Sequence, residues 1–226
     1  MEYSTTGQTA AGRYAQLESN RSSYYDDAKD CSKLTIPTLI PETATGTRAK
    51  TKTPFQAVGA RGVNSLASKL LFALLPPSTA FFKLSIDSLE LLKQGQEGLE
   101  TEIDKGLRTI ESALMNEIEI SNDRVAMFEA LKHLIVGGNA LLYLTDNGLK
   151  VYPLNKFVCK RDAVGNVLEI ITKESVHPQA LSDEFIEQIM KKENYDAESM
   201  TDDLDIYTYV KRVGDNHFWY QECKGE

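Results

Sequence analysis

Hydrophobic residues recur at helical spacing through the first half of the chain and at strand spacing through the second half. Residues 9–34 contain no proline, and Tyr14, Leu17 and Ala28 have spacings compatible with one helical face. Two prolines follow closely and disfavour helix at the positions before them. We therefore expect an amphipathic helix over this segment, then a threonine-rich, basic loop over residues 42–52.

A second helix is expected over residues 54–75. Thr53 followed by Pro54 is a typical helix start, because threonine can cap a free amide and proline already has the backbone angle of the first turn. Small residues between positions 57 and 67 would let another backbone approach closely. We predict that this helix is central and buried. Its apolar stripe consists of Val58, Val63, Leu66, Leu70 and Leu74.

One strand and two further helices are expected before residue 137. Aromatic and alternating residues favour a strand over 80–87, and apolar residues three and four apart favour a helix over 90–119 that can break at Gly95 and Gly98. The next predicted helix covers 124–136, and the Gly-Gly-Asn after it is typical of a left-handed helix end. The predicted core residues of this helix are Phe128, Leu131 and Ile135.

Three β-hairpins are predicted after residue 139. The Asn-Gly pair at 147–148 supplies the positive φ angles that a tight hairpin turn needs. The predicted strand pairs are 140–144 with 149–153, 157–160 with 167–172, and 206–210 with 218–223, with a short helix over 182–191. The pattern predicts an α+β fold, in which long amphipathic helices pack on antiparallel hairpins. Residues 1–136 form the mainly helical region and residues 137–226 the hairpin-rich region.

Composition and charge narrow the class of protein. The chain has 226 residues and a formal net charge of -8, which argues against tight binding of nucleic acid, because phosphate binding depends on lysine and arginine. The longest apolar stretch, residues 70–77, is far shorter than the roughly 20 residues of a membrane span. We expect no membrane partner, no secretory signal, and three reduced thiols at Cys31, Cys159 and Cys223.

Recognisable catalytic motifs are missing from the sequence. His133, His177 and His217 are scattered, and none has a second ligand at zinc spacing. The glycines at 59 and 62 match neither the P-loop nor the dinucleotide fingerprint. We therefore predict no cofactor and no enzyme activity.

Two charged clusters are candidate binding sites. Glu117, Glu119 and Asp123 could gather a divalent metal, but positions two apart on a helix point in different directions, so a solvated face is favoured. The basic residues have two interpretations, a solvated loop or a contact with DNA or with an acidic neighbouring subunit. These basic residues are Arg48, Lys50, Lys52 and Arg61.

Long blocks of the sequence resemble one family. Residues 53–70 read TPFQAVGARGVNSLASKL, and similar blocks follow in the same order: RVAMFEALKHLIVGGNALLYL at 124–144, VCKRDAVGNVLEIIT at 158–172 and DIYTY at 205–209. The TIPTLIP of residues 35–41 also resembles that family. These blocks are similar to those of the head-to-tail connector, or portal, proteins of short-tailed phages that encode their own single-subunit RNA polymerase.

The resemblance implies a wing-like fold within a dodecameric, homo-oligomeric ring at one capsid vertex of the virion. It implies that a terminase packaging motor drives double-stranded DNA through the ring, and that capsid, scaffolding and tail adaptor proteins contact it after assembly in the host cytoplasm. Connector chains are much longer, so the channel stem, clip and crown are expected beyond residue 226. The alternatives are a tail or scaffold adaptor and, less favoured, a carboxylate-metal enzyme that processes DNA.

Overall fold

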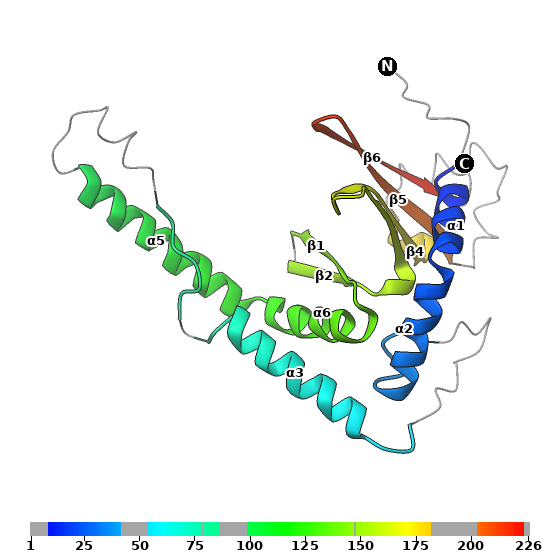
Figure 1. Cartoon of the computed structure of the whole chain (residues 1–226). Coiled ribbons are helices and arrows are strands. Elements are labelled where there is room, and N and C mark those ends of the chain that lie inside the picture. Colours follow the sequence, from blue (N-terminus) through cyan, green and yellow to red (C-terminus); the bar gives the residue numbers. More distant parts are fainter. Residues whose placement is uncertain are drawn as a thin grey trace. The chain divides into compact units, whose positions relative to one another are not determined.

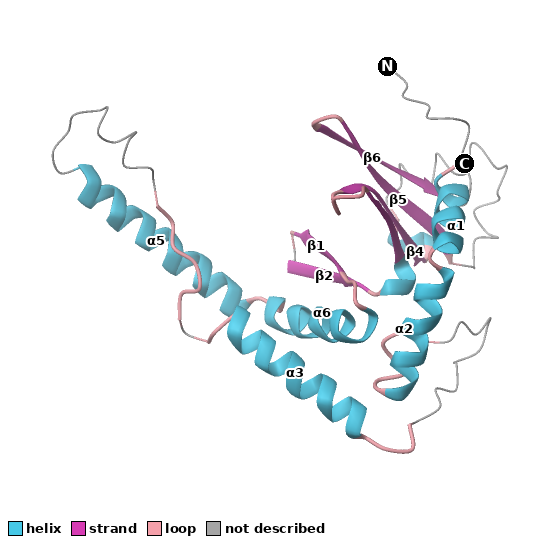
Figure 2. Ribbon diagram, viewed as in Figure 1, coloured by secondary structure: helices cyan, strands magenta, loops and turns pink. Residues whose placement is uncertain are grey.

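The computed structural model describes residues 9–41, 54–77, 79–85, 99–146, 148–181 and 203–223. Contacts divide the chain into two compact units: unit 1 comprises Met1–Ala28 and Pro153–Glu226, and unit 2 comprises Lys29–Tyr152. Both helices and antiparallel sheets are present (Figures 1 and 2), which confirms the α+β class. Unit 1 therefore combines the two ends of the sequence, whereas the two regions predicted from the sequence meet after residue 136.

Unit 1 contains a four-stranded antiparallel sheet of order β3-β4-β5-β6. Its strands are β3 (Phe157–Arg161), β4 (Val167–Val176), β5 (Leu204–Val213) and β6 (Asn216–Cys223). The two hairpins predicted here are confirmed, and pairing between β4 and β5 joins them into one sheet. Gly214, with φ 64°, supplies the left-handed backbone of the last turn.

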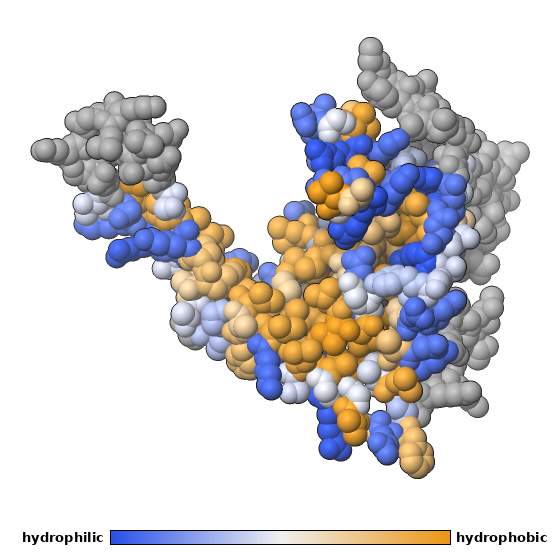
Figure 3. All heavy atoms as spheres, in the orientation of Figure 1, coloured by the Kyte–Doolittle hydropathy of each residue, from blue (hydrophilic) through white to orange (hydrophobic). Residues whose placement is uncertain are grey.

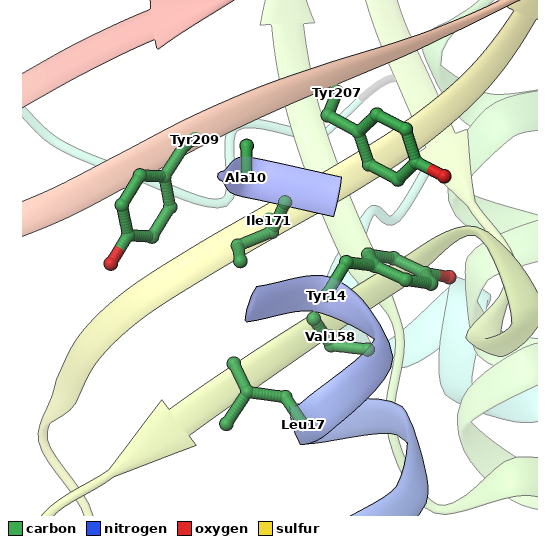
Figure 4. Packing of buried hydrophobic residues seen from close by; sticks show 7 residues of the cluster. All are labelled: Ala10, Tyr14, Leu17, Val158, Ile171, Tyr207 and Tyr209. Carbon is green, nitrogen blue, oxygen red and sulfur yellow. The ribbon is translucent and has the colours of Figure 1, made fainter. Parts of the chain in front are cut away.

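One helix, α1 (Ala10–Asn20), covers a face of this sheet. Apolar side chains of the helix meet alternate residues of β3, β4 and β5, as strand geometry dictates. The rings of Tyr14 and Tyr207 meet edge to face with centroids 5.6 Å apart. The buried cluster comprises Ala10, Tyr14, Leu17, Val158, Ile171, Tyr207 and Tyr209 (Figure 4).

Buried carboxylates fix α1 to the sheet. Glu222 of β6 accepts a hydrogen bond of 2.6 Å from the amide of Ala10, where the helix leaves backbone donors without partners. Glu169 of β4 accepts from the Arg13 guanidinium and, at 2.5 Å, from the Tyr209 hydroxyl. The helix is therefore held by polar contacts as well as by apolar burial.

The single helix predicted over residues 9–34 is two helices in the structure. The chain breaks at Arg21, and α2 (Ser22–Leu34) follows. Asn20 and Ser22 flank the break, and such residues compete with helical backbone hydrogen bonds. The Arg21 guanidinium donates to the carbonyl of Leu154 at 2.8 Å, a contact that lies 133 residues away in sequence and has no local signal.

Unit 2 is mainly helical. It contains α3 (Val58–Leu74), α5 (Leu99–Ile120) and α6 (Asp123–Gly137), with the hairpin of β1 (Leu141–Thr145) and β2 (Gly148–Tyr152). Helix α6 packs against α3, β2 and α5, so it is the centre of this unit. Its left-handed end at Gly138, with φ 69°, and the β1–β2 hairpin are confirmed predictions. Two short 3-10 turns, Leu154–Lys156 and Pro178–Ala180, lie in unit 1.

Two local predictions are wrong. Helix α3 begins at Val58, after an Ala57 cap that makes no side-chain hydrogen bond, and residues 54–57 are not helical. The first turn of this helix packs closely on the end of α2, because a Cβ on Gly59 would lie 2.6 Å from the carbonyl oxygen of Leu34. Residues 80–85 form no strand, because the amide of Leu84 bonds Glu111 of α5 at 2.6 Å instead of a neighbouring strand.

Other predictions fall partly or wholly outside the described residues. The helix expected over 90–119 is confirmed from Leu99 onward, and the Gly95 and Gly98 break lies outside. The helix expected over 182–191 also lies outside. In the described part of the chain, no helix combines the length and apolar character needed to cross a membrane.

Candidate functional site

Among the residues that the structure describes, helix α3 has one buried side. Val63 and Ala67 are buried, and this side of α3 faces α6, whose Ala130 and Leu131 are buried as well. Ala67 and Gly59 have little or no side chain, which permits close approach of the packed elements. The Arg124 side chain donates to the carbonyl of Leu75 at 2.5 Å and so fixes the end of α3 to the start of α6.

The other side of α3 is exposed and apolar. Val58 is 70% exposed and Phe72 is 62% exposed, and Leu66 is exposed beside them. Positions 58, 65 and 72 are seven residues apart, which places them on one side of a helix. We call this surface, with Val58, Arg61, Leu66, Lys69 and Phe72, the outward face of α3.

The predicted burial of this helix is therefore wrong within a single chain. Val58, Leu66 and Leu74 are exposed, whereas Val63 is buried and Leu70 is intermediate. In α6, Leu131 is buried, and Phe128 and Ile135 are intermediate. The sequence pattern identified an apolar stripe but could not tell which part of it the same chain covers.

A second exposed apolar surface lies on α5. Ile110 is 50% exposed and Leu114 is 44% exposed, one turn apart, and Ile103 and Leu107 on the same stripe are intermediate. No residue of α5 from Thr101 to Ile120 is buried. We call these four residues the apolar stripe of α5.

Strand β1 adds three consecutive exposed apolar residues, Leu142, Tyr143 and Leu144. The sequence pattern predicts these residues only as half of a hairpin and does not predict their exposure. A run of three large apolar residues without alternation is typical of a strand covered on both faces, so no signal in the sequence indicates this exposure. In the space-filling view, apolar residues form one broad area over α3, α6 and the β1–β2 hairpin (Figure 3).

The carboxylates considered for a metal have other roles. The Asp123 side chain accepts from the amide of Leu149 at 2.7 Å and from the Ser121 hydroxyl at 2.8 Å. Glu117 and Glu119 are exposed on α5. Within the residues that the structure describes, no group of three or more metal-ligating side chains comes together.

The histidines do not form a site. His133 is buried in α6, 3.8 Å from Glu129 of the same helix, and burial lowers its pKa although Glu129 opposes that effect. His177 lies at a 3-10 turn, where its Nδ1 accepts from the Gln179 amide at 3.3 Å. His217 is exposed in β6.

The predicted basic cluster is only partly visible. Arg61 is exposed on the outward face of α3, one turn from Val58. The other three members, Arg48, Lys50 and Lys52, lie outside the described residues. The contact predicted for this cluster stays a prediction.

An exposed apolar face on a helix whose opposite side is well packed is typical of subunits that associate. A family model described as "Bacteriophage head to tail connecting protein" matches residues 7–222, and the chain belongs to this family. It is 38% identical over 223 residues to the portal protein of Escherichia phage T7, covering 94% of this chain and 41% of that protein.

Other portal proteins match in the same way. The portal protein of Enterobacteria phage T3 is 40% identical over 208 residues, 89% of this chain and 38% of that protein. That of Enterobacteria phage SP6 is 32% identical over 168 residues, 70% of this chain and 31% of that protein. The chain thus spans about two fifths of the length of the first two relatives.

Proposed function

We propose that this chain is the wing part of a portal subunit, which forms a ring at one capsid vertex. Double-stranded DNA passes through the ring during packaging and ejection, and the tail attaches below it. Family membership supports this function, and the exposed outward face of α3 is the structural observation that carries it. Large apolar side chains at more than half exposure are costly to hydrate, so a ring that covers them is favoured.

The proposed role is mechanical. Capsid and scaffolding proteins, the terminase packaging motor and tail adaptor proteins are the proposed partners, and the virion is the proposed location. The net charge of -8 supports a conduit past which a duplex moves without adhering, because like charges repel. No bond is made or broken by this chain, and its contribution is the free energy of contacts that hold copies together.

The test is to place a charge on the exposed apolar face of the full-length protein. We expect Phe72→Asp to fold normally, because Phe72 is exposed, but to reduce the fraction of protein in rings by at least about tenfold, since an unpaired charge would be buried in the contact. Sedimentation velocity and negative-stain imaging measure that fraction, and circular dichroism checks the fold.

Val164→Asp is the matched control. Val164 is exposed in the turn between β3 and β4, and we expect its variant to form rings like the unchanged protein. The proposal fails if the unchanged full-length protein stays monomeric at high concentration, or if Phe72→Asp assembles as well as the control.

A further inference from the structure

The helices that carry the exposed apolar surfaces of α3 and α5 have net charges of opposite sign. Helix α3 contains Arg61 and Lys69 and no acidic residue, so its net charge is +2. Helix α5 contains six acidic and two basic residues, so its net charge is 2 − 6 = −4. Two different helices of one chain therefore present complementary apolar faces.

We propose that the outward face of α3 in one copy packs against the apolar stripe of α5 in the next copy. The inference rests on the proposed ring function, and it names the two surfaces that meet. The occupant of each surface is thus a second copy of this chain.

The charges sit where such a contact needs them. At 100° per residue, Arg61 and Lys69 lie on the two sides of the line that joins Val58 and Phe72. On α5, Asp104 and Glu117 are exposed and lie on opposite sides of the stripe that contains Ile110 and Leu114. Charged side chains therefore lie beside apolar ones on both helices, and a contact there can combine apolar burial with charge pairing.

The charge pattern also selects the symmetry. If α3 of one copy met α3 of the next across a two-fold axis, Arg61 and Lys69 of one copy would face Arg61 and Lys69 of the other. These like charges would repel. If α5 met α5, its net charge of −4 would face itself. A contact between α3 and α5 avoids both conflicts, and it is heterologous, which is the kind of contact that closes a ring of many copies.

The described elements of the chain leave open space beside both surfaces. A Cβ on Gly62 of α3 or on Gly106 of α5 would meet no atom within 4 Å. Helix α3 packs on α6 through its other side, which contains Val63 and Ala67, and α5 also contacts α6. Both surfaces can therefore accept a neighbouring helix without repacking unit 2.

Charge reversal in the full-length protein tests the pairing. The double variant Arg61→Glu with Lys69→Glu, and separately Asp104→Lys with Glu117→Lys, should each raise the protein concentration for half-maximal ring formation at least about tenfold at low salt. The variant with all four changes should return to within about threefold of the unchanged protein, because each chain then carries both reversed faces.

The controls reverse charges on the same helix away from the stripe. Lys105 and Glu119 lie on the opposite side of α5, so Lys105→Glu with Glu119→Lys should leave ring formation unchanged. The effects of the double reversals should shrink in high salt, because exposed charges are screened. All variants are compared by sedimentation velocity, with circular dichroism to verify folding.

Each outcome decides the pairing. Restoration of rings by the fourfold variant supports it. Double variants that assemble normally overturn it while leaving the ring function intact, and a fourfold variant no better than the double variants shows that the two faces do not meet each other. If the unchanged protein forms no ring, the proposed function itself fails, and this result is distinct from the others.

Discussion

Glu169 is a buried charged residue of unit 1 that has two side-chain partners. Its carboxylate is buried, accepts from Arg13 and Tyr209, and lies beneath α1. Burial alone would raise the pKa of Glu169, but the hydrogen bonds from Arg13 and Tyr209 outweigh burial and lower it. The same environment raises the pKa of Tyr209, through burial first and then through Glu169.

We expect Glu169→Gln to lower the free energy of unfolding by about 1.5–3 kcal/mol at neutral pH, the usual range for hydrogen bonds to a charged group. A carboxyl group whose pKa is lower in the folded state than in the unfolded state stabilises the folded protein at pH values above the unfolded-state pKa of about 4.3. This stabilisation is lost as the pH falls through the folded-state pKa. The difference in unfolding free energy between the unchanged protein and Glu169→Gln should therefore shrink toward zero as the pH falls from 7 through the lowered folded-state pKa. Urea titrations across this pH range measure it.

Asp215→Asn is the control for Glu169. Asp215 is exposed in the turn between β5 and β6, so its variant should change stability by less than about 0.5 kcal/mol. A Glu169→Gln deficit that stays constant at acid pH would contradict the role assigned to the carboxylate.

Asp123 and Gly148 form a tight pair in unit 2. Gly148 has φ 109°, and a Cβ there would lie 2.8 Å from the Asp123 carboxylate. We expect Gly148→Ala to cost about 1–3 kcal/mol, from backbone strain and from this clash. The cost should be smaller in an Asp123→Ala background, where only the strain remains. Equal costs in both backgrounds, measured by urea titration, would exclude the clash.

At the scale of elements, α1 depends on a strand far away in sequence. Glu222 of β6 accepts from the amides of Ala10 at 2.6 Å and Ala11 at 3.5 Å. Thr9 also caps the helix, by accepting from the Gly12 amide at 3.1 Å. A carboxylate and a hydroxyl thus satisfy amides that the first turn leaves without helical partners.

We expect Glu222→Ala to release the start of α1 from the sheet, because buried amides would lose their acceptor at a cost of about 1–3 kcal/mol. Hydrogen exchange of the amides in α1 should become faster by at least about tenfold, while exchange in β4 changes less. Gln221→Ala, whose side chain bonds Thr208 on the opposite face of the sheet, is the control and should leave α1 unchanged. Equal exchange in both variants would argue against the cap.

Element prediction succeeded where the signal is local. Turns with Asn-Gly or glycine at positive φ identified the three hairpins, and a Gly-Gly-Asn run identified the end of α6. Element prediction failed where a residue far away in the sequence determines the local structure. The amide of Leu84 bonds Glu111 of α5 instead of a neighbouring strand.

At the scale of the whole molecule, assembly should cover what the single chain leaves exposed. In hydroxyl-radical footprinting of the full-length protein, we expect Phe72 to be oxidised at least about fivefold more slowly in rings than in the monomers of the Arg61→Glu, Lys69→Glu variant, because a neighbouring copy would exclude solvent. Phe72 oxidised equally in both forms would contradict burial of the outward face of α3.

Part of the candidate assembly surface can be predicted from the sequence. Spacing predicts the apolar stripe of α3, whereas for Arg61 the sequence leaves two interpretations, a solvated residue or a contact with DNA or an acidic neighbouring subunit. Spacing could not show that Val63 and Ala67 face α6 while Val58 and Phe72 face outward, because both sides of this helix are apolar. The exposure of Leu142, Tyr143 and Leu144 was also missed, since a hairpin pattern does not say which face is covered.

The sequence by itself determined the α+β class, the hairpins, most helices and the family, because periodicity, turn chemistry and long ordered blocks are written in neighbouring residues. Tertiary structure alone decided that α1 joins the C-terminal sheet through Glu169 and Glu222, and which side of α3 stays exposed. These features depend on pairs more than a hundred residues apart or on packing against another helix. Local spacing carries no information about either.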